Sequence, residues 1–332
     1  MAETITREAM FYEKLEDQKV RCQLCPHSCV LKSGQRGICR GRKNVDGKMI
    51  AVNYGQSVGL SVDPIEKKPL YHYRPRSTII SVGPNSCNFS CFFCQNYDIS
   101  QLDCPTRYIT IEQLYSLVGE YCKDGPRQIA FTYTEPFMWY EFIHDFANFA
   151  NDTDIIMITN GYISPDPLKK LMPRISAMNI DLKAIRDDFY RKYAGGTLEP
   201  VKQTIIAAHE SKVHIELTNL LIPGLNDSEE DIDDLIDFVA SIDVNIPLHF
   251  SAYYPAYKAT IPATSPLSVL NACKIASEKL SYVYGGNIYT ESFQETTCPK
   301  CGATLITAGR KMTGISETGT CKNCGHRIYG VF

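Results

Sequence analysis

The sequence lacks the features that would attach it to a membrane or to duplex nucleic acid. Its 332 residues contain no apolar run approaching about 18 residues, the length that a membrane-spanning helix requires. Residues 1–8 are charged and carry no apolar core of a secretory signal. The net charge is only −3, so a broad phosphate-binding surface is not expected. We therefore expect a cytoplasmic protein with no membrane attachment and no nucleic-acid partner.

Two common catalytic signatures are also missing. The phosphate-loop pattern GxxxxGK[ST] does not occur, and no local motif indicates a Ser-His-Asp set. Cysteine, by contrast, is abundant: the chain has 14. A chain of this length buries a large core without cross-links. Without a secretory signal, clustered cysteines indicate metal binding rather than disulfides. Cys104, Cys122 and Cys273 stand alone, and the last two lie in helix-like stretches as small apolar residues.

The C-terminal cysteines have the most regular spacing. They form two CxxC turns, each followed by glycine: Cys298, Cys301, Cys321 and Cys324. Four thiolates close a tetrahedral site with no open position. The segment therefore predicts a structural zinc site or a single rubredoxin-type iron.

The N-terminal cysteines are spaced less regularly, at Cys22, Cys25, Cys29 and Cys39. Turn-forming residues fill the gaps. Four thiolates hold either zinc or an iron–sulfur cluster, and His27 is an alternative ligand. The spacing leaves the choice of metal open.

A central cluster contains only three cysteines, Cys87, Cys91 and Cys94. Three thiolates are too few for a closed site, so they indicate a missing partner or an open metal position, and an open position is how metal sites do chemistry. The spacing also fits one face of a helix. The strand-like run 77–82, followed by Gly83-Pro84-Asn85, argues for a strand that enters a loop.

Residues 86–96, Ser-Cys-Asn-Phe-Ser-Cys-Phe-Phe-Cys-Gln-Asn, resemble the CxxxCxxC loop of the radical S-adenosylmethionine (SAM) superfamily. The resemblance implies that the three thiolates hold a [4Fe–4S] cluster whose fourth iron takes the amine and carboxylate of SAM. It also implies an enzyme in which the reduced cluster cleaves SAM to methionine and a 5′-deoxyadenosyl radical. That radical abstracts hydrogen from a substrate.

Three other segments carry the same resemblance. Thr134-Glu135-Pro136 is similar to the Gly-Gly-Glu segment that binds the SAM amine, although the glycines are replaced by Tyr133 and Thr134. Glu135 equally fits a position beside the start of a helix. The resemblance places Asn160 near the ribose and Lys183 near the SAM carboxylate. Asp181 shares a strand face with Lys183, and the two also fit a simple ion pair. We expect Phe93 to pack near the adenine.

Apolar strands alternate with amphipathic helices along the chain. Strands are expected near 78–82, 128–133, 154–159, 177–182, 213–221 and 246–252. Helices are expected near 110–123, 137–150, 186–193, 199–211, 228–241 and 266–280. This alternation predicts an α/β fold with a parallel sheet whose carboxyl edge carries the site. It agrees with the partial (β/α)6 barrel of the superfamily.

The predicted domains are an N-terminal cysteine-rich extension, the radical SAM core and a C-terminal four-cysteine ribbon. Their expected bounds are 1–76, 77–290 and 295–332. The segments 25–29, 34–39 and 94–96 together resemble the AmmeMemoRadiSam radical SAM enzymes, relatives of the pyruvate formate-lyase activating enzymes. That resemblance implies Memo-like and AMMECR-type partner proteins. A reducing partner such as ferredoxin or flavodoxin is also expected.

The substrate stays open at this stage, and two other functions remain. One is an activase that installs a glycyl radical on a partner enzyme. The extra cysteines weaken that reading, because they precede the CxxxCxxC loop, whereas in activases they usually follow it. The other is a non-catalytic metal-binding or electron-transfer module, against which the open three-cysteine site and the βα units count.

Overall fold

A nine-stranded sheet forms the centre of the molecule. The computed structural model describes residues 7–123 and 125–332. Across the sheet the strands are β15 (Val283–Gly286), β14 (Leu248–Ala252), β13 (His214–Leu221), β12 (Ile175–Asp181), β11 (Asp154–Thr159), β10 (Gln128–Phe131), β8 (Thr78–Pro84), β7 (Gln56–Pro64) and β9 (Arg107–Tyr108). The seven strands from β15 to β8 are parallel, whereas β7 and β9 run antiparallel. The sheet is open, with β15 and β9 at its edges.

The central strands are mostly buried, because helices and loops cover both of their faces. Every residue of β10 is buried, and so are all but the first of β8. Strands buried along nearly their whole length are typical of parallel sheets, whose two faces are both covered. The parallel α/β sheet predicted from the sequence is therefore confirmed.

Helices follow most of the parallel strands. They are α1 (Tyr97–Ser100), α2 (Ile111–Tyr121), α3 (Tyr140–Phe149), α4 (Pro165–Leu171), α5 (Asp187–Phe189), α6 (Glu199–Glu210), α7 (Glu229–Ile242) and α8 (Pro266–Ser277). Three 3-10 turns, η1 (Ile65–Lys67), η2 (Pro136–Trp139) and η3 (Met172–Arg174), and a π-turn, η4 (Tyr190–Ala194), complete the set. Thr110 and Gln113 form a capping box that starts α2. Helix α2 packs on β8, α6 on β13, and α8 on β14 and β15.

The structure differs from the expected six βα units in three ways. A seventh parallel strand, β15, extends the sheet beyond β14. Strand β7 lies inside the predicted extension 1–76 but pairs antiparallel with β8 and so belongs to the main sheet. Helix α4 was not predicted, because its Pro165-Asp166-Pro167 start reads as a turn. Proline in the first turn of a helix removes a donor that has no partner there.

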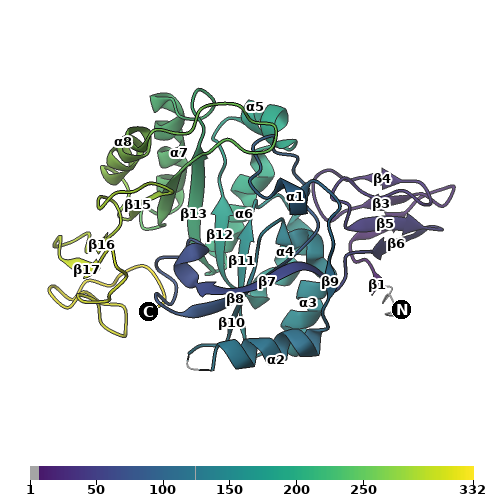
Figure 1. The fold of residues 1–332 in the computed structure, drawn as a ribbon, viewed down its shortest axis with the longest axis horizontal. Helices are drawn as coiled ribbons and strands as arrows, with labels where there is room; N and C mark the ends of the chain where they lie inside the picture. The colour runs from purple at the N-terminus through teal and green to yellow at the C-terminus, as the bar shows by residue number, and fades with distance from the viewer. Residues whose placement is uncertain (1–6, 124) are drawn as a thin grey trace.

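The two outer cysteine segments lie at opposite ends of the long axis (Figure 1). At one end, β1 (Arg7–Glu8), β5 (Arg42–Val45) and β6 (Lys48–Ala51) form one small sheet. Beside it, β2 (Tyr12–Lys14), β3 (Val20–Cys22) and β4 (Val30–Leu31) form a second. At the other end, β16 (Thr296–Thr297) and β17 (Thr304–Ile306) make a short ribbon. Within residues 7–123 and 125–332, none of the helices has the length and apolar character needed to cross a bilayer.

Candidate functional site

One cavity of about 620 Å³ collects the predicted site residues at the carboxyl edge of the sheet. Cys87, Cys91 and Cys94 line it from the loop after β8. Phe93, Glu135, Asn160, Asp181 and Lys183 line it from the same loop and from the ends of β10, β11 and β12. The parallel topology explains this gathering, since the carboxyl ends of parallel strands share one edge of the sheet.

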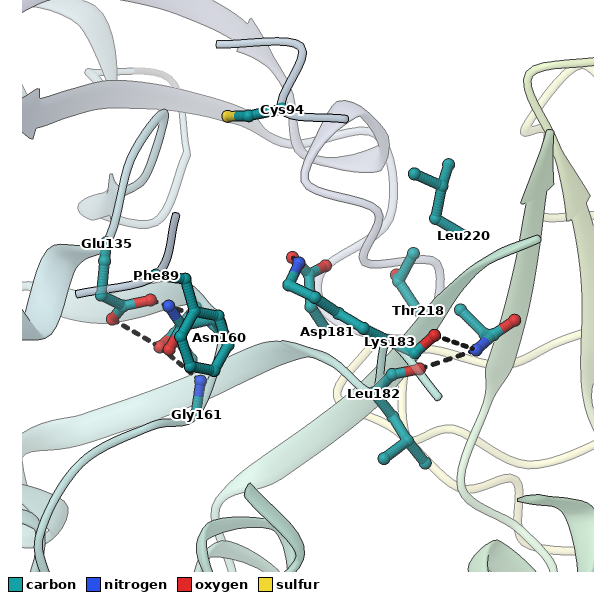
Figure 2. A network of polar contacts seen from close by, with 12 residues as sticks. Phe89, Cys94, Glu135, Asn160, Gly161, Asp181, Leu182, Lys183, Thr218 and Leu220 are labelled. Carbon is teal, nitrogen blue, oxygen red and sulfur yellow. Dashed lines mark hydrogen bonds and ion pairs between the residues drawn. The ribbon is translucent and has the colours of Figure 1, made fainter. Parts of the chain in front are cut away.

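Glu135 is a buried carboxylate with three hydrogen-bond donors. It accepts from the backbone N–H of Asn160 at 2.7 Å, the hydroxyl of Thr159 at 2.7 Å and the backbone N–H of Phe137 at 3.0 Å. Burial nevertheless raises the pKa of Glu135 to about 7. Figure 2 shows the carboxylate directed toward Asn160 and Gly161. The same side chain caps η2, so the interpretation that Glu135 lies beside the start of a helix is correct. A cation bound next to Glu135 would stabilise the charged form of this carboxylate.

Asn160 links this acid to the cysteine loop. Its side-chain amide donates to Asn88 Oδ1 at 2.9 Å and lies 4.0 Å from Cys87 Sγ. Asn88 in turn donates to the carbonyl of Tyr162 at 2.6 Å. The segment after β11 and the cysteine loop are therefore held together by buried amides.

Asp181 and Lys183 form an ion pair at 2.8 Å in the middle of the cavity (Figure 2). Burial disfavours the charged amine, but Asp181 and Cys91 outweigh it and raise the pKa of Lys183. The ammonium group therefore stays protonated close to the cysteines. It is positioned to balance negative charge on a bound anionic group or on a thiolate.

Tyr133 adopts a left-handed backbone with φ of 71°, the region that favours glycine. It stands at one of the two positions where the resembling segment has glycine. Its hydroxyl bonds Ser61 at 2.5 Å, and its carbonyl accepts from the Asn96 amide at 2.6 Å. These contacts hold a strained residue between β10 and Glu135, which is where strain accumulates in functional sites.

Several lining residues were not predicted from the sequence. Phe89 lines the cavity from the cysteine loop, and Thr218 and Leu220 line it from β13 (Figure 2). The positions of Thr218 and Leu220 on β13 could have been inferred from the sequence, because every second residue of a strand lies on the same face. The place of the adenine relative to Phe93 stays a prediction.

A buried carboxylate and imidazole pair lies at the floor of the cavity. His249 on β14 lines the cavity, and its Nε2 lies 2.7 Å from Glu216 Oε2. Glu216 also bonds His214 Nε2 at 3.1 Å and accepts from the backbone N–H groups of Tyr71 and His72. Although burial opposes its ionisation, the hydrogen bonds of the two histidines hold the pKa of Glu216 well below its usual range. The carboxylate therefore fixes the orientation of the His249 ring.

The C-terminal cysteines converge closely. The four Sγ atoms of Cys298, Cys301, Cys321 and Cys324 all lie within 4.8 Å of one another. Two of the pairs are 3.6 and 3.7 Å apart. Tetrahedral bonds of about 2.3 Å to one ion place thiolate sulfurs roughly 3.8 Å apart. The group therefore fits a single metal ion, and the identity of that ion stays a prediction.

The N-terminal cysteines are adjacent to one another but spread wider. Burial, together with the charge of neighbouring cysteines, raises the pKa of Cys25 to about 12 and that of Cys39 to about 11. A methyl group placed on Gly37 would lie 3.9 Å from both Cys29 Sγ and Cys39 Sγ. His27 instead bonds the carbonyl of Asn88 at 2.7 Å. Whether these cysteines bind metal stays a prediction.

Comparisons with known proteins identify a matching family model and a relative of similar length. The model of the Radical SAM superfamily matches residues 82–239. An uncharacterized protein from Methanocaldococcus jannaschii is 42% identical over 97% of this chain and 98% of that protein. The chain therefore contains a segment that matches the radical SAM model, and it shares its family with the archaeal protein along nearly its whole length.

Other similarities are more limited. A probable GTP 3′,8-cyclase from Methanosarcina mazei is 29% identical over 46% of this chain and 47% of that protein. Among solved structures, a domain of the pyruvate-formate lyase-activating enzyme from Bacteroides vulgatus is 18% identical. That similarity covers 48% of this chain and 98% of the domain, with a TM-score of 0.42.

The match to the radical SAM model implies a [4Fe–4S] cluster and SAM, and the donor set fits that cluster. Three thiols line one cavity, and no fourth cysteine lines it within the described residues. The backbone N–H of Phe89 donates to Cys87 Sγ at 3.4 Å, and the Ser100 hydroxyl lies 3.2 Å from Cys94 Sγ. Hydrogen bonds to sulfur are a known means of tuning such clusters.

Proposed function

We propose that this protein is an enzyme that cleaves SAM reductively at Cys87, Cys91 and Cys94 and uses the resulting radical on a substrate in the same cavity. A [4Fe–4S] cluster held by these three thiolates would supply the electron that breaks the sulfonium bond of SAM, and the products would be methionine and a 5′-deoxyadenosyl radical able to abstract hydrogen. The observation that carries the proposal is the open three-thiol site that shares one cavity with the buried carboxylate Glu135.

Four side chains of the protein bind and orient SAM. Glu135 receives the amine of SAM, because a buried carboxylate with its remaining charge uncompensated favours an ammonium partner. Lys183 receives the carboxylate of SAM, with Asp181 holding the ammonium group in place at 2.8 Å. Asn160 lies between them on the ribose side, and Phe93 supplies an apolar face for the adenine. These four contacts are carried over from the resemblance.

The floor of the cavity is the place for the substrate. Thr218, Leu220 and His249 line it from β13 and β14, away from the cysteine loop. The volume of about 620 Å³ falls in the range of small-molecule sites, about 300–1,000 Å³. A small molecule therefore fits better than a folded protein surface. His249, oriented by Glu216, is the polar group positioned to contact it.

We also propose the partner proteins with which this enzyme works. The cysteine and glycine pattern of the N-terminal segment supports an AmmeMemoRadiSam enzyme that works with Memo-like and AMMECR-type proteins. It is proposed to act in the cytoplasm with a ferredoxin or flavodoxin as reductant. Residues 1–76, 77–290 and 295–332 are its proposed extension, core and ribbon.

The test is SAM cleavage by anaerobically reconstituted protein reduced with dithionite. We expect release of 5′-deoxyadenosine, measured by chromatography and mass spectrometry. Cys91→Ala removes one thiolate and is expected to abolish the product while the metal content of the C-terminal cysteines stays unchanged. The matched control is Cys122→Ala, which removes a buried cysteine outside all three clusters. Zinc, or no metal, between residues 87 and 94 would favour the non-catalytic module.

A further inference from the structure

The four N-terminal cysteines, like the central three, do not converge as closely as the C-terminal four do. Only the C-terminal sulfurs, among the described residues, gather three or more within 4.8 Å. Mononuclear zinc requires that convergence, whereas a cubane binds each thiolate at a different iron and spreads them. Cys22, Cys25 and Cys39 are buried, and Cys29 is half-buried. The N-terminal set is therefore enclosed but too wide for a single ion.

A buried cation faces these sulfurs. Arg42 is 1% exposed, and its Nη1 donates to Cys22 Sγ at 3.5 Å. Its Nη2 pairs with Glu141, while its Nε has no partner among the described residues. A guanidinium group that is fully buried requires nearby negative charge. Glu141 supplies one such charge, and thiolates that hold a cluster would add negative charge on the side of Arg42 that faces Cys22.

The N-terminal set is also connected directly to the radical SAM loop. The hydroxyl of Ser86 donates to the carbonyl of Cys39 at 2.8 Å, and Ser86 is bonded through its peptide to Cys87. On the other side of Cys87, the carbonyl of Asn88 lies 2.7 Å from His27 Nε2. Both neighbours of Cys87 thus contact the N-terminal loops. One hydrogen bond separates the chain that carries Cys39 from the chain that carries Cys87.

None of the four N-terminal cysteines lines the cavity that holds Cys87, Cys91 and Cys94. They lie behind the cysteine loop, so a group bound there does not contact the substrate. Its position suits the transfer of electrons into the loop rather than the binding of a reactant.

We propose that Cys22, Cys25, Cys29 and Cys39 hold a second [4Fe–4S] cluster that relays electrons to the radical SAM cluster. This inference rests on the proposed function. A one-electron carrier such as flavodoxin or ferredoxin reduces the second cluster from the 2+ to the 1+ state. The second cluster passes that electron to the radical SAM cluster and returns to 2+. One electron enters and one leaves for each SAM cleaved.

The first test uses the full chain, reconstituted anaerobically and reduced with dithionite. Electron paramagnetic resonance is expected to show two [4Fe–4S]+ signals, of which only one changes when SAM is added. In a Cys87→Ala/Cys91→Ala/Cys94→Ala variant, analysis is expected to give about four sulfides and about four irons, with one further iron if the C-terminal cysteines hold iron rather than zinc. Zinc without sulfide in that variant overturns the inference but leaves the proposed function intact. Two clusters of which neither responds to SAM overturn the proposed function and the relay together.

The second test examines the relay. In a Cys25→Ala/Cys39→Ala variant, the ratio of the flavodoxin-driven to the dithionite-driven rate of SAM cleavage is expected to fall about tenfold or more. The control is Cys122→Ala/Cys273→Ala, which removes two isolated buried cysteines and should leave the ratio unchanged. An unchanged ratio in the first variant overturns the relay.

A milder variant covers the case in which the double variant fails to fold. Ser86→Ala keeps every thiol and deletes only the hydroxyl that contacts Cys39. We expect unchanged iron content together with slower flavodoxin-driven reduction of the SAM-responsive signal. Equal reduction rates in Ser86→Ala and the unmodified protein overturn the proposed path.

Discussion

Two residues at the site have properties that are unusual for their residue type, one in its backbone conformation and the other in its pKa. Tyr133 occupies a backbone conformation suited to glycine, and Glu135 is an acid whose pKa of about 7 reflects burial without a compensating cation. Both residues lie within three positions of one another after β10. Departures of this kind are expected where a ligand completes the structure.

At this scale, Glu135→Gln tests the proposed partner of the SAM amine. Loss of a charge-assisted contact is expected to weaken SAM binding by roughly 10- to 100-fold, measured by calorimetry on the oxidised, reconstituted protein. Bound SAM lowers the pKa of Glu135, so the complex holds fewer protons than the free protein. Affinity in the unmodified protein should therefore rise with pH toward about 7. The part of this pH dependence that comes from Glu135 should vanish in the variant.

Glu120→Gln is the matched control, because Glu120 is exposed on α2. It should bind SAM with unchanged affinity. If Glu135→Gln also retained full affinity, the amine would have to bind elsewhere.

At the scale of elements, the register between β8 and its neighbours positions both the cysteine loop and Glu135. Gly83 pairs with Gly59 of β7 on one side. On the other side, a methyl group on Gly83 would lie 2.0 Å from the carbonyl oxygen of Thr132. No other residue fits there without parting β8 from the chain that leads to Glu135.

Gly83→Ala is therefore expected to destabilise the protein by about 3 kcal/mol and to reduce SAM cleavage. Urea unfolding under anaerobic conditions measures the first effect. Its register partner provides the control, because nothing lies within 4 Å of a methyl group built on Gly59. Gly59→Ala should change stability by less than about 0.5 kcal/mol. Equal effects of the two substitutions would contradict the close approach of Gly83 to Thr132.

At the scale of the whole molecule, the C-terminal ribbon is joined to the base of the sheet. The carbonyl of Tyr329 lies 2.7 Å from His72 Nδ1, and the Tyr329 hydroxyl donates to the carbonyl of Ile215 at 3.3 Å. His72 and Ile215 flank Glu216, the residue that orients His249. We therefore expect metal binding by the ribbon to affect the floor of the cavity.

Cys301→Ser is expected to release the C-terminal metal and to lower the Tm by about 5 °C or more. Hydrogen exchange should increase in residues 298–332 and at the start of β13. Lys300→Ala, in the same CxxC turn but exposed, should leave both the metal and the Tm unchanged. If the increase in hydrogen exchange in Cys301→Ser were confined to residues 298–332, the ribbon would not support β13.

The sequence by itself determined the three cysteine groups and the alternating strands whose ends carry Glu135, Asn160, Asp181 and Lys183. Local spacing encodes such features, because a CxxxCxxC loop or a strand end depends only on nearby residues. The seventh parallel strand escaped prediction, since β15 has only four residues, two of them glycine.

Only the tertiary structure decided which distant groups meet. Ser86 contacts Cys39 across 47 positions, His249 contacts Glu216 across 33, and Tyr329 reaches His72 across 257. No local pattern specifies such pairs, because they form when the packing of the sheet, the extension and the ribbon brings their surfaces together. The connection between the two cysteine groups and the orientation of the cavity floor are therefore properties of the packed molecule.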